Sequence, residues 1–209
     1  MSKSILAAAA ALGAALALAQ SAPALAQLPA GVFAGEHDYK AADAGGYAID
    51  ASHTAVIARV SHIGYGLSVF RFDKVEGSLT WDPAQPAKSA LSVTVDTASI
   101  ATPVPGFSAE LQGDNFLKSA AFPKATFVST AFHQIDAGHG KVDGQFTLMG
   151  KTRPVTFDVE LIGAGKGFMG HPRLGIEAKT AINPADYGLN PMFATPIQLV
   201  IDAEFAKAP

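Results

Sequence analysis

Six histidines and two pairs of closely spaced carboxylates are the side chains in this chain of 209 residues that could bind a metal ion or transfer a proton. Protein zinc sites commonly take two ligands from one short segment, such as two Cys or two His a few residues apart. The histidines here are scattered without an H-x-H or H-x-x-x-H pair, and the chain has no cysteine. The sequence therefore predicts no metal site and no thiol chemistry.

The motifs for catalysis and for phosphate binding are incomplete. Residues 165–170 match G-x-G-x-x-G, but a further strand is expected after them, whereas a dinucleotide site needs the N-terminus of a helix. The end of a phosphate-binding loop is matched at 150–152, yet Gln145 stands where that motif needs a glycine. The Asp/Glu pairs at 158–160 and 202–204 alternate with apolar residues, which indicates the solvated face of a strand. We predict no catalytic residue and no enzyme.

Apolar and polar residues alternate along most of the chain, most clearly from Val155 to Leu161. A period of two places all the apolar side chains on one face of a strand. Because Gly, Pro, Asn and Asp separate these segments, we expect strands near residues 47–50, 54–62, 69–72, 77–81, 90–96, 125–133, 141–148, 154–161, 174–183 and 197–205. Mixed three-to-five spacing between Phe107 and Phe122 predicts a short helix. The predicted fold class is all-β, an antiparallel barrel of about eight strands with a short helical insertion.

The N-terminal residues have the pattern of a targeting segment. Lys3 precedes an Ala/Leu run at 5–19 that is shorter than a membrane span, and Ala24-Leu25-Ala26 is a small-residue cleavage site. We predict a signal peptide at 1–26, a flexible arm at 27–46, one barrel domain at 47–209, and a periplasmic or secreted location. The formal net charge of −3 without a Lys/Arg run argues against nucleic acid and against an anionic membrane surface as partners, and no transmembrane segment is expected in the mature chain.

An eight-stranded barrel is either filled by its own side chains or hollow enough for one ligand. Small residues recur among the large inward-facing ones, at Ala58, Gly77, Gly144 and Ala178, and would leave space. Gly and Ala also occur at bends and in tapered packing. Composition alone therefore leaves the two interpretations balanced.

Five short motifs occur in order along the chain. They are Tyr47–Asp50 with His53-Thr54, Val60–Tyr65, Ala98–Thr102, residues 114–130 with Phe122-Pro123, and Val142–Val155. Over Gly46 to Lys207 the chain resembles the YceI-like family, exported lipocalin-like proteins linked to the binding of polyisoprenoid and related long-chain lipids. It departs from the family pattern at three places. Pro184-Ala185 occupy the position of the family's Arg-Ser, Ala58 the position where many members have Phe, and Phe70 the position where many have Gly.

The resemblance implies a hollow barrel that holds an apolar chain, in a soluble periplasmic protein that binds or carries an isoprenoid-tailed or other long-chain amphipathic lipid without a further cofactor. From the strand alternation the candidate lining is Val56, Ala58, Val60, Phe72, Leu79, Trp81, Leu91, Val93, Val95, Phe127, Phe146, Leu148, Phe157, Val159, Ile176, Ala178, Leu199 and Ile201. Three polar residues, His62, Asp114 and Asp186, are candidates to bind the head group. The helix is a candidate lid placed by Phe107, Phe116 and Phe122.

Two alternatives remain open. In the first, Phe70, Trp81 and Phe146 fill the barrel, which then acts as a stress-response or interaction module through an exposed strand edge. In the second, the protein is an enzyme acting on such a lipid, with His62 or Asp114 as general base. The oligomeric state is also open, with a homodimer as one alternative.

Overall fold

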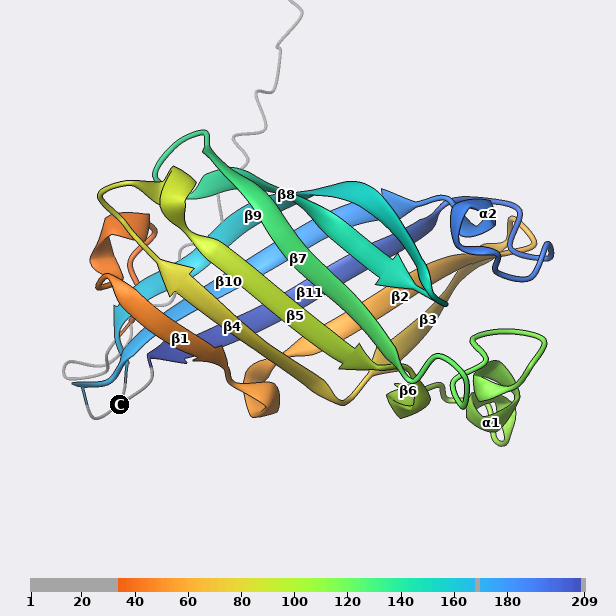
Figure 1. The fold of residues 1–209 in the computed structure, drawn as a ribbon. Coiled ribbons are helices and arrows are strands. Elements are labelled where there is room, and N and C mark those ends of the chain that lie inside the picture. The colour runs from red at the N-terminus through yellow and green to blue at the C-terminus, as the bar shows by residue number, and fades with distance from the viewer. Residues whose placement is uncertain (1–33, 168–169, 208–209) are drawn as a thin grey trace, which may run out of the picture. The chain divides into compact units, whose positions relative to one another are not determined.

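The computed structural model describes residues 34–167 and 170–207. Its strands and helices follow each other along the chain as shown in Figure 1. In order they are β1 (Gly45–Ile49), β2 (Ala55–His62), β3 (Gly66–Phe72), β4 (Val75–Trp81), β5 (Ala90–Asp96), β6 (Ile100–Ala101), α1 (Phe107–Gln112), β7 (Lys124–Gln134), β8 (His139–Leu148), β9 (Lys151–Lys166), β10 (Pro172–Ile182), α2 (Pro184–Tyr187) and β11 (Ile197–Lys207). No helix of this described part is long and apolar enough to cross a membrane.

The strands form one closed antiparallel barrel. β1 and β2 are two halves of one bent strand, since both pair with β11, through Ile49↔Phe205 and Val56↔Ile201. The β3–β4 and β5–β6 segments are bent in the same way, because β4 pairs with β1 and β5 while β3 pairs with β2 and β6. With these three pairs counted as single strands, the barrel has eight strands and closes between β1 and β11. The predicted fold class is confirmed.

The bends in these long strands have local causes. The Asp50 carboxylate accepts a hydrogen bond from the Ser52 N–H (3.1 Å) and caps a single 3₁₀ turn at Ala51–His53. Asp96 caps the turn Thr97–Ser99 in the same way, through the Ala98 N–H (2.9 Å). An aspartate that bonds its own backbone two residues on competes with the ladder of a sheet. Two of the three bent strands, β1–β2 and β5–β6, are therefore interrupted at a capped turn and change direction there.

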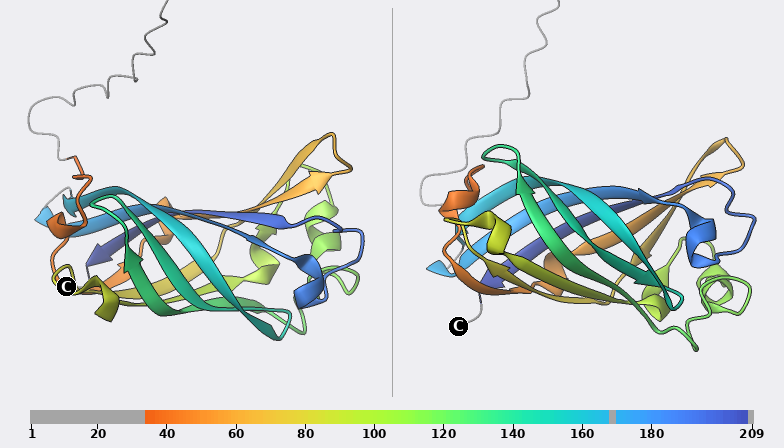
Figure 2. Two further views of the ribbon diagram at one scale, coloured as in Figure 1. Left: turned by 90° about the horizontal axis from the view of Figure 1, so that it is seen from above. Right: turned by 45° about the horizontal axis from the view of Figure 1, so that its top comes forward.

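Two helices lie at one end of the barrel (Figure 2). α1 occupies only the first part of the region where a helix was predicted. α2 was not predicted, because the alternation of β10 was extended to Asn183. In the structure the Asn183 side chain accepts a hydrogen bond from the Ala185 N–H (3.2 Å), and Pro184 occupies the first turn. Asparagine at the cap and proline at the first helical position are both typical helix starts.

The described part of the predicted arm, residues 34–46, contacts the barrel. Glu36 forms a two-way backbone bridge with Ala164 in β9, with N···O distances of 2.8 and 2.9 Å. A 3₁₀ turn follows at Tyr39–Ala41, and Ala42 has no solvent exposure. An Ala/Gly-rich segment lacks periodicity, so tertiary contacts of this kind leave no local signal. The predicted signal peptide and residues 27–33 of the arm lie outside the described residues.

Candidate ligand-binding cavity

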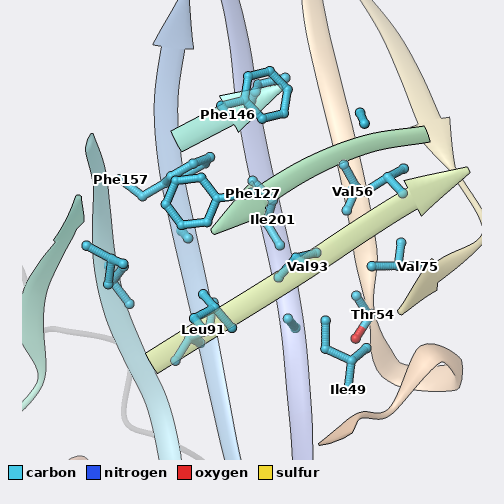
Figure 3. A pocket seen from close by; sticks show the side chains of 18 of the residues that line it. Ile49, Thr54, Val56, Val75, Leu91, Val93, Phe127, Phe146, Phe157 and Ile201 are labelled. Atoms are coloured by element: carbon cyan, nitrogen blue, oxygen red, sulfur yellow. The ribbon is translucent and has the colours of Figure 1, made fainter. Parts of the chain in front are cut away.

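A cavity of about 280 Å³ lies inside the barrel, and its wall is almost entirely aliphatic and aromatic. Figure 3 shows side chains from several strands around one space, among them Val56, Leu91, Val93, Phe127 and Ile201. Every apolar residue that the alternation placed in the interior does line this cavity, from Val56 in β2 to Ile201 in β11. Whether these residues contact a ligand stays a prediction.

The wall is apolar because apolar and polar residues alternate along its strands, apart from bulges in β7 and between β9 and β10. In β9, Phe157, Val159 and Leu161 line the cavity, while the Asp158 and Glu160 side chains between them are exposed. Such alternation buries one face of a sheet and leaves the other in water. The carboxylates are therefore surface groups, as the sequence predicted.

The small residues do not all leave space. A Cβ on Gly144 would lie 2.3 Å from the Phe127 ring, and a Cβ on Gly77 would lie 2.6 Å from the Ile49 side chain. These two glycines make room for a neighbouring side chain, so at these positions the structure favours the packing interpretation over added space. Ala58 and Ala178, in contrast, line the cavity directly.

The end of the barrel next to α1 is closed by packed aromatic rings. Phe70 of β3 contacts Phe107 of α1 (ring centroids 6.1 Å apart), Phe107 contacts Phe116 (6.4 Å), and Phe116 contacts Phe193 in the loop before β11 (5.8 Å). Aromatic pairs at these separations contribute beyond their buried area. We call these four residues the aromatic lid. Phe116 and Phe193 line the cavity, so the lid forms its closed end.

The large residues that could have filled the barrel pack at its wall. Besides Phe70 in the lid, Phe146 packs edge-on against Tyr187 of α2 (5.4 Å) and Trp81 against Tyr39 of the N-terminal segment (6.1 Å). Their rings bound the cavity and leave its centre unfilled. Phe122, predicted as part of a lid, instead lies against Gly150, where a Cβ would be 2.9 Å from the ring.

The opposite end of the cavity has a polar rim. It is formed by the β7–β8 turn, and the members of this rim that line the cavity are His133, Gln134, Asp136, His139 and Lys141, all of them exposed. Asp136 accepts hydrogen bonds from the Gly138 N–H (2.9 Å), the His139 N–H (2.8 Å) and the His139 ring (2.9 Å). These bonds, led by that from Gly138, lower the pKa of Asp136. We call these five residues, His133, Gln134, Asp136, His139 and Lys141, the polar rim.

The N-terminal segment connects the polar rim to Trp81. The Tyr39 N–H donates to the Ala137 carbonyl in the β7–β8 turn (3.1 Å), while the Tyr39 ring contacts Trp81. The Trp81 Nε1 atom is buried and has no hydrogen-bond partner among the described residues. Buried indole N–H groups usually have a partner. This donor is therefore the one unmatched polar group on an otherwise apolar part of the described wall.

The three residues that the sequence suggested for a head group do not reach the cavity. His62, Asp114 and Asp186 are exposed and do not line the cavity. The prediction that His62 lies in the interior was wrong because β2 extends beyond the barrel. The pairing of β11 with β2 stops at Gln198↔Arg59, three residues before His62. The polar rim was missed, although Asp136-Ala137-Gly138-His139 is a recognisable turn sequence between two predicted strands.

A cluster on the barrel surface could hold a cation. Ligand atoms of Asp50, His53 and Glu204 lie within 4.8 Å of one another. Arg173 pairs with both carboxylates, and its Nη2 lies 2.9 Å from Asp50. Hydrogen bonds from Ser52, His53 and Arg173 hold the pKa of Asp50 far below its usual value. The guanidinium thus already balances the charge of this cluster, which ties the start of β10 to the capped turn between β1 and β2.

A closed eight-stranded antiparallel barrel around an apolar cavity belongs to the lipocalin-like class of barrels, which can hold one small ligand. The sequence model described as the YceI-like domain matches residues 47–205, and the chain belongs to this family. A UPF0312 protein of Vibrio cholerae is 33% identical over 159 residues, covering 74% of this chain and 83% of the relative. Another, from Pseudomonas putida, is 35% identical over 158 residues, covering 75% and 82%.

Solved structures share the fold. BcnA of Burkholderia cenocepacia aligns with a TM-score of 0.67 at 21% identity, over 75% of this chain and 98% of its own. The YceI protein of Campylobacter jejuni aligns with a TM-score of 0.61 at 25% identity, over 67% and 85%. A polyisoprenoid binding domain from Saccharophagus degradans, implicated in plant cell wall breakdown, aligns with a TM-score of 0.54 at 18% identity, over 80% and 100%.

Proposed function

We propose that this protein binds a long-chain amphipathic lipid, with an isoprenoid tail or another slender apolar chain, in the barrel cavity and carries it in the periplasm. One observation carries the proposal: the wall is apolar from the aromatic lid to the far end, where the polar rim begins. A site of this kind selects a molecule with one long apolar part and one polar end.

The cavity favours a chain over a bulky ligand. Its volume of about 280 Å³ lies near the lower end of the range of roughly 300–1,000 Å³ for small-molecule sites. Each Å² of apolar surface removed from water contributes about 25 cal/mol, and this term needs no directional bonds. Burial of apolar surface can therefore bind an isoprenoid or an acyl chain without selecting for its detailed structure.

The two ends of the cavity give the ligand a direction. The tail would lie toward the buried aromatic lid, and the head group toward the exposed polar rim. At the rim Lys141, His133 and His139 each pair with a carboxylate, so the unmatched donor of the described wall that can meet a head-group oxygen near the mouth is the Trp81 N–H. The likeness to a polyisoprenoid binding domain supports an isoprenoid tail.

We also propose that the protein is exported and acts as a carrier without turning over its lipid. The Ala/Leu run and cleavage pattern within residues 1–26 support export. At the rim His139 is bonded to Asp136, and His133 Nε2 lies 2.7 Å from the Asp143 carboxylate. Both imidazoles thus belong to exposed surface pairs, and the family fold is that of binding proteins. A lipid recovered from the protein with unchanged mass would support this part of the proposal.

Native mass spectrometry of the protein, purified without detergent from the periplasm of its own host, tests the proposal. We expect a discrete adduct of lipid mass that organic extraction removes and that a prenyl or acyl lipid restores on titration. The extracted protein should show no adduct with a short polar analogue of the same head group. An apo mass that also rejects prenyl and acyl lipids in titration would overturn the proposal. It would favour the ligand-free interaction module instead.

A further inference from the structure

The β2–β3 hairpin projects from the barrel at the end that carries the aromatic lid (Figure 2). β11 pairs with β2 only as far as Arg59, and β6 pairs with β3 only at Arg71 and Phe72. Within the described chain, residues 60–70 are therefore a two-stranded ribbon without a further strand on either side. We call this segment the hairpin tip.

The outer surface of the hairpin tip is apolar and exposed. Ile63 is 83% exposed and Tyr65 is 91% exposed, and they are followed by the half-exposed Leu67 and Val69 on the same face of β3. Isolated apolar side chains on a surface are ordinary, but a contiguous group on a projecting element indicates a contact site. Phe70, with the opposite parity, points inward and lines the cavity.

The turn itself is occupied by a residue that fits it poorly. Ile63 has a φ of 53°, a left-handed conformation that is unfavourable for a β-branched side chain and that Gly or Asn adopts readily. A glycine or asparagine would suit this turn, whereas Ile63 is one of the most apolar side chains. Strain of this kind is often found where function requires the residue.

The charge pattern around the hairpin tip fits a membrane interface. No Asp, Glu, Lys or Arg occurs from Val60 to Phe70, whereas Arg59 and Arg71 flank the segment and are exposed. Arg59 lies four residues before Ile63, or roughly 13 Å at about 3.3 Å per residue. Interfacial segments bury their apolar face by about 5–10 Å, with Arg reaching back toward phosphate and Tyr at the boundary.

We propose that the hairpin tip inserts Ile63 and Tyr65 into the interface of a phospholipid bilayer, with the Arg59 guanidinium at the level of the phosphates. This inference rests on the proposed function, because a carrier must exchange its lipid with a membrane. The low net charge argues against attraction to an anionic surface, and insertion by burial does not need it. A convex tip also suits a fluid interface better than a second protein copy, since a stable dimer needs about 800 Å² per partner.

Docking in this way would bring the tail end of the cavity to the bilayer. Val60 and Phe70 of the hairpin tip line the cavity, and the exposed Met192 lies in the same loop as Phe193 of the aromatic lid. A lid of aromatic rings that opens against hydrocarbon does not expose those rings to water. The polar rim, at the opposite end of the barrel, stays in solvent.

Sedimentation with sucrose-loaded vesicles of four parts phosphatidylcholine and one part phosphatidylglycerol tests the proposal on the full mature chain. The paired substitutions Ile63→Ser and Tyr65→Ser should lower the partition coefficient at least about tenfold, because both side chains lose their burial in the interface. The matched control replaces Ile135 and Ile162, which are 61% and 52% exposed and lie away from the hairpin tip, with Ser. We expect the control to partition as the unchanged protein does.

Two results would overturn the docking proposal. One is equal partitioning of the hairpin variant and the unchanged protein, or no partitioning of either. The other is sedimentation equilibrium that shows a dimer dissociated by the hairpin substitutions, which would assign the tip to a second copy of the chain.

A second readout separates this proposal from the proposed function. When a prenyl lipid is added from ethanol in the absence of vesicles, the hairpin variant should show the same lipid adduct as the unchanged protein, because the wall of the cavity is intact. Vesicle binding without any lipid adduct would overturn the proposed function and leave the docking site in place. A lipid adduct without vesicle binding would support the proposed function and overturn the docking site.

Discussion

Filling the cavity with a side chain should abolish lipid binding without unfolding the barrel. Ala178 of β10 is the position of choice, because it lines the cavity and pairs with Val159 of β9 and Ile201 of β11. An apolar cavity of about 150 Å³ accepts one benzene ring, so the ring of Ala178→Phe would take up about half of the 280 Å³. The matched control is Ala181→Phe, an exposed position on the same strand.

The expected size of the effect follows from that lost volume. At about 24 cal/mol per Å³, giving up about 150 Å³ costs a ligand roughly 3–4 kcal/mol, or a few hundredfold in Kd. The ring replaces empty space, so the free energy of unfolding of the apo protein should stay within about 1 kcal/mol of its original value or rise.

Lipid titration followed by native mass spectrometry measures the Kd, and urea unfolding of the extracted protein measures the free energy of unfolding. A Kd within threefold of the original would show that the ligand lies elsewhere. A loss of more than about 2 kcal/mol of stability would show that the interior is already packed.

Two further substitutions test what stabilises the barrel, and urea unfolding measures both. Asp50→Asn should remove about 1.5–3 kcal/mol from the free energy of unfolding at neutral pH. Because the pKa of Asp50 is lowered in the folded state, its stabilisation is full above the unfolded pKa near 4 and is lost as the pH falls below that value. The variant should therefore lose less stability in acid than the unchanged protein, and parallel pH profiles would refute this. Gly144→Ala should cost about 1–3 kcal/mol, because its Cβ would meet the Phe127 ring at 2.3 Å, whereas Gly46→Ala has open space and serves as control.

The barrel and the wall of its cavity could be predicted because they depend on a local property, the alternation within each strand. Val93, Val159 and Ile201 are far apart in sequence, yet each faces inward because its neighbours along the strand are polar or shorter. Parity needs no knowledge of the partner strand. The same property fails where a strand leaves the barrel. His62 has the parity of Val60, but the sheet that would bury it ends at Arg59.

The ends of the barrel could not be predicted, because contacts between distant segments build them. Glu36 pairs with Ala164, and the Tyr39 ring meets Trp81 while its backbone N–H meets Ala137. None of these contacts has a local signature in a segment rich in Ala and Gly. The positions Gly77 and Gly144 show the same limit, since only the facing side chains, Ile49 and Phe127, decide whether a missing Cβ leaves space or accepts a ring.

This difference bears on how members of one barrel family can differ in ligand. Alternation gives each member a similar apolar interior, and burial of apolar surface favours the binding of any chain that fits there. On the proposed function, discrimination must then come from the ends, where Trp81 and the polar rim would meet the head group and where Phe116 and Phe193 would limit the length of the tail. In this chain both ends are built from loops and from the N-terminal segment, which tolerate change better than the strands do. Exchanging the ends between relatives should therefore transfer ligand preference, whereas exchanging wall residues of equal volume should not.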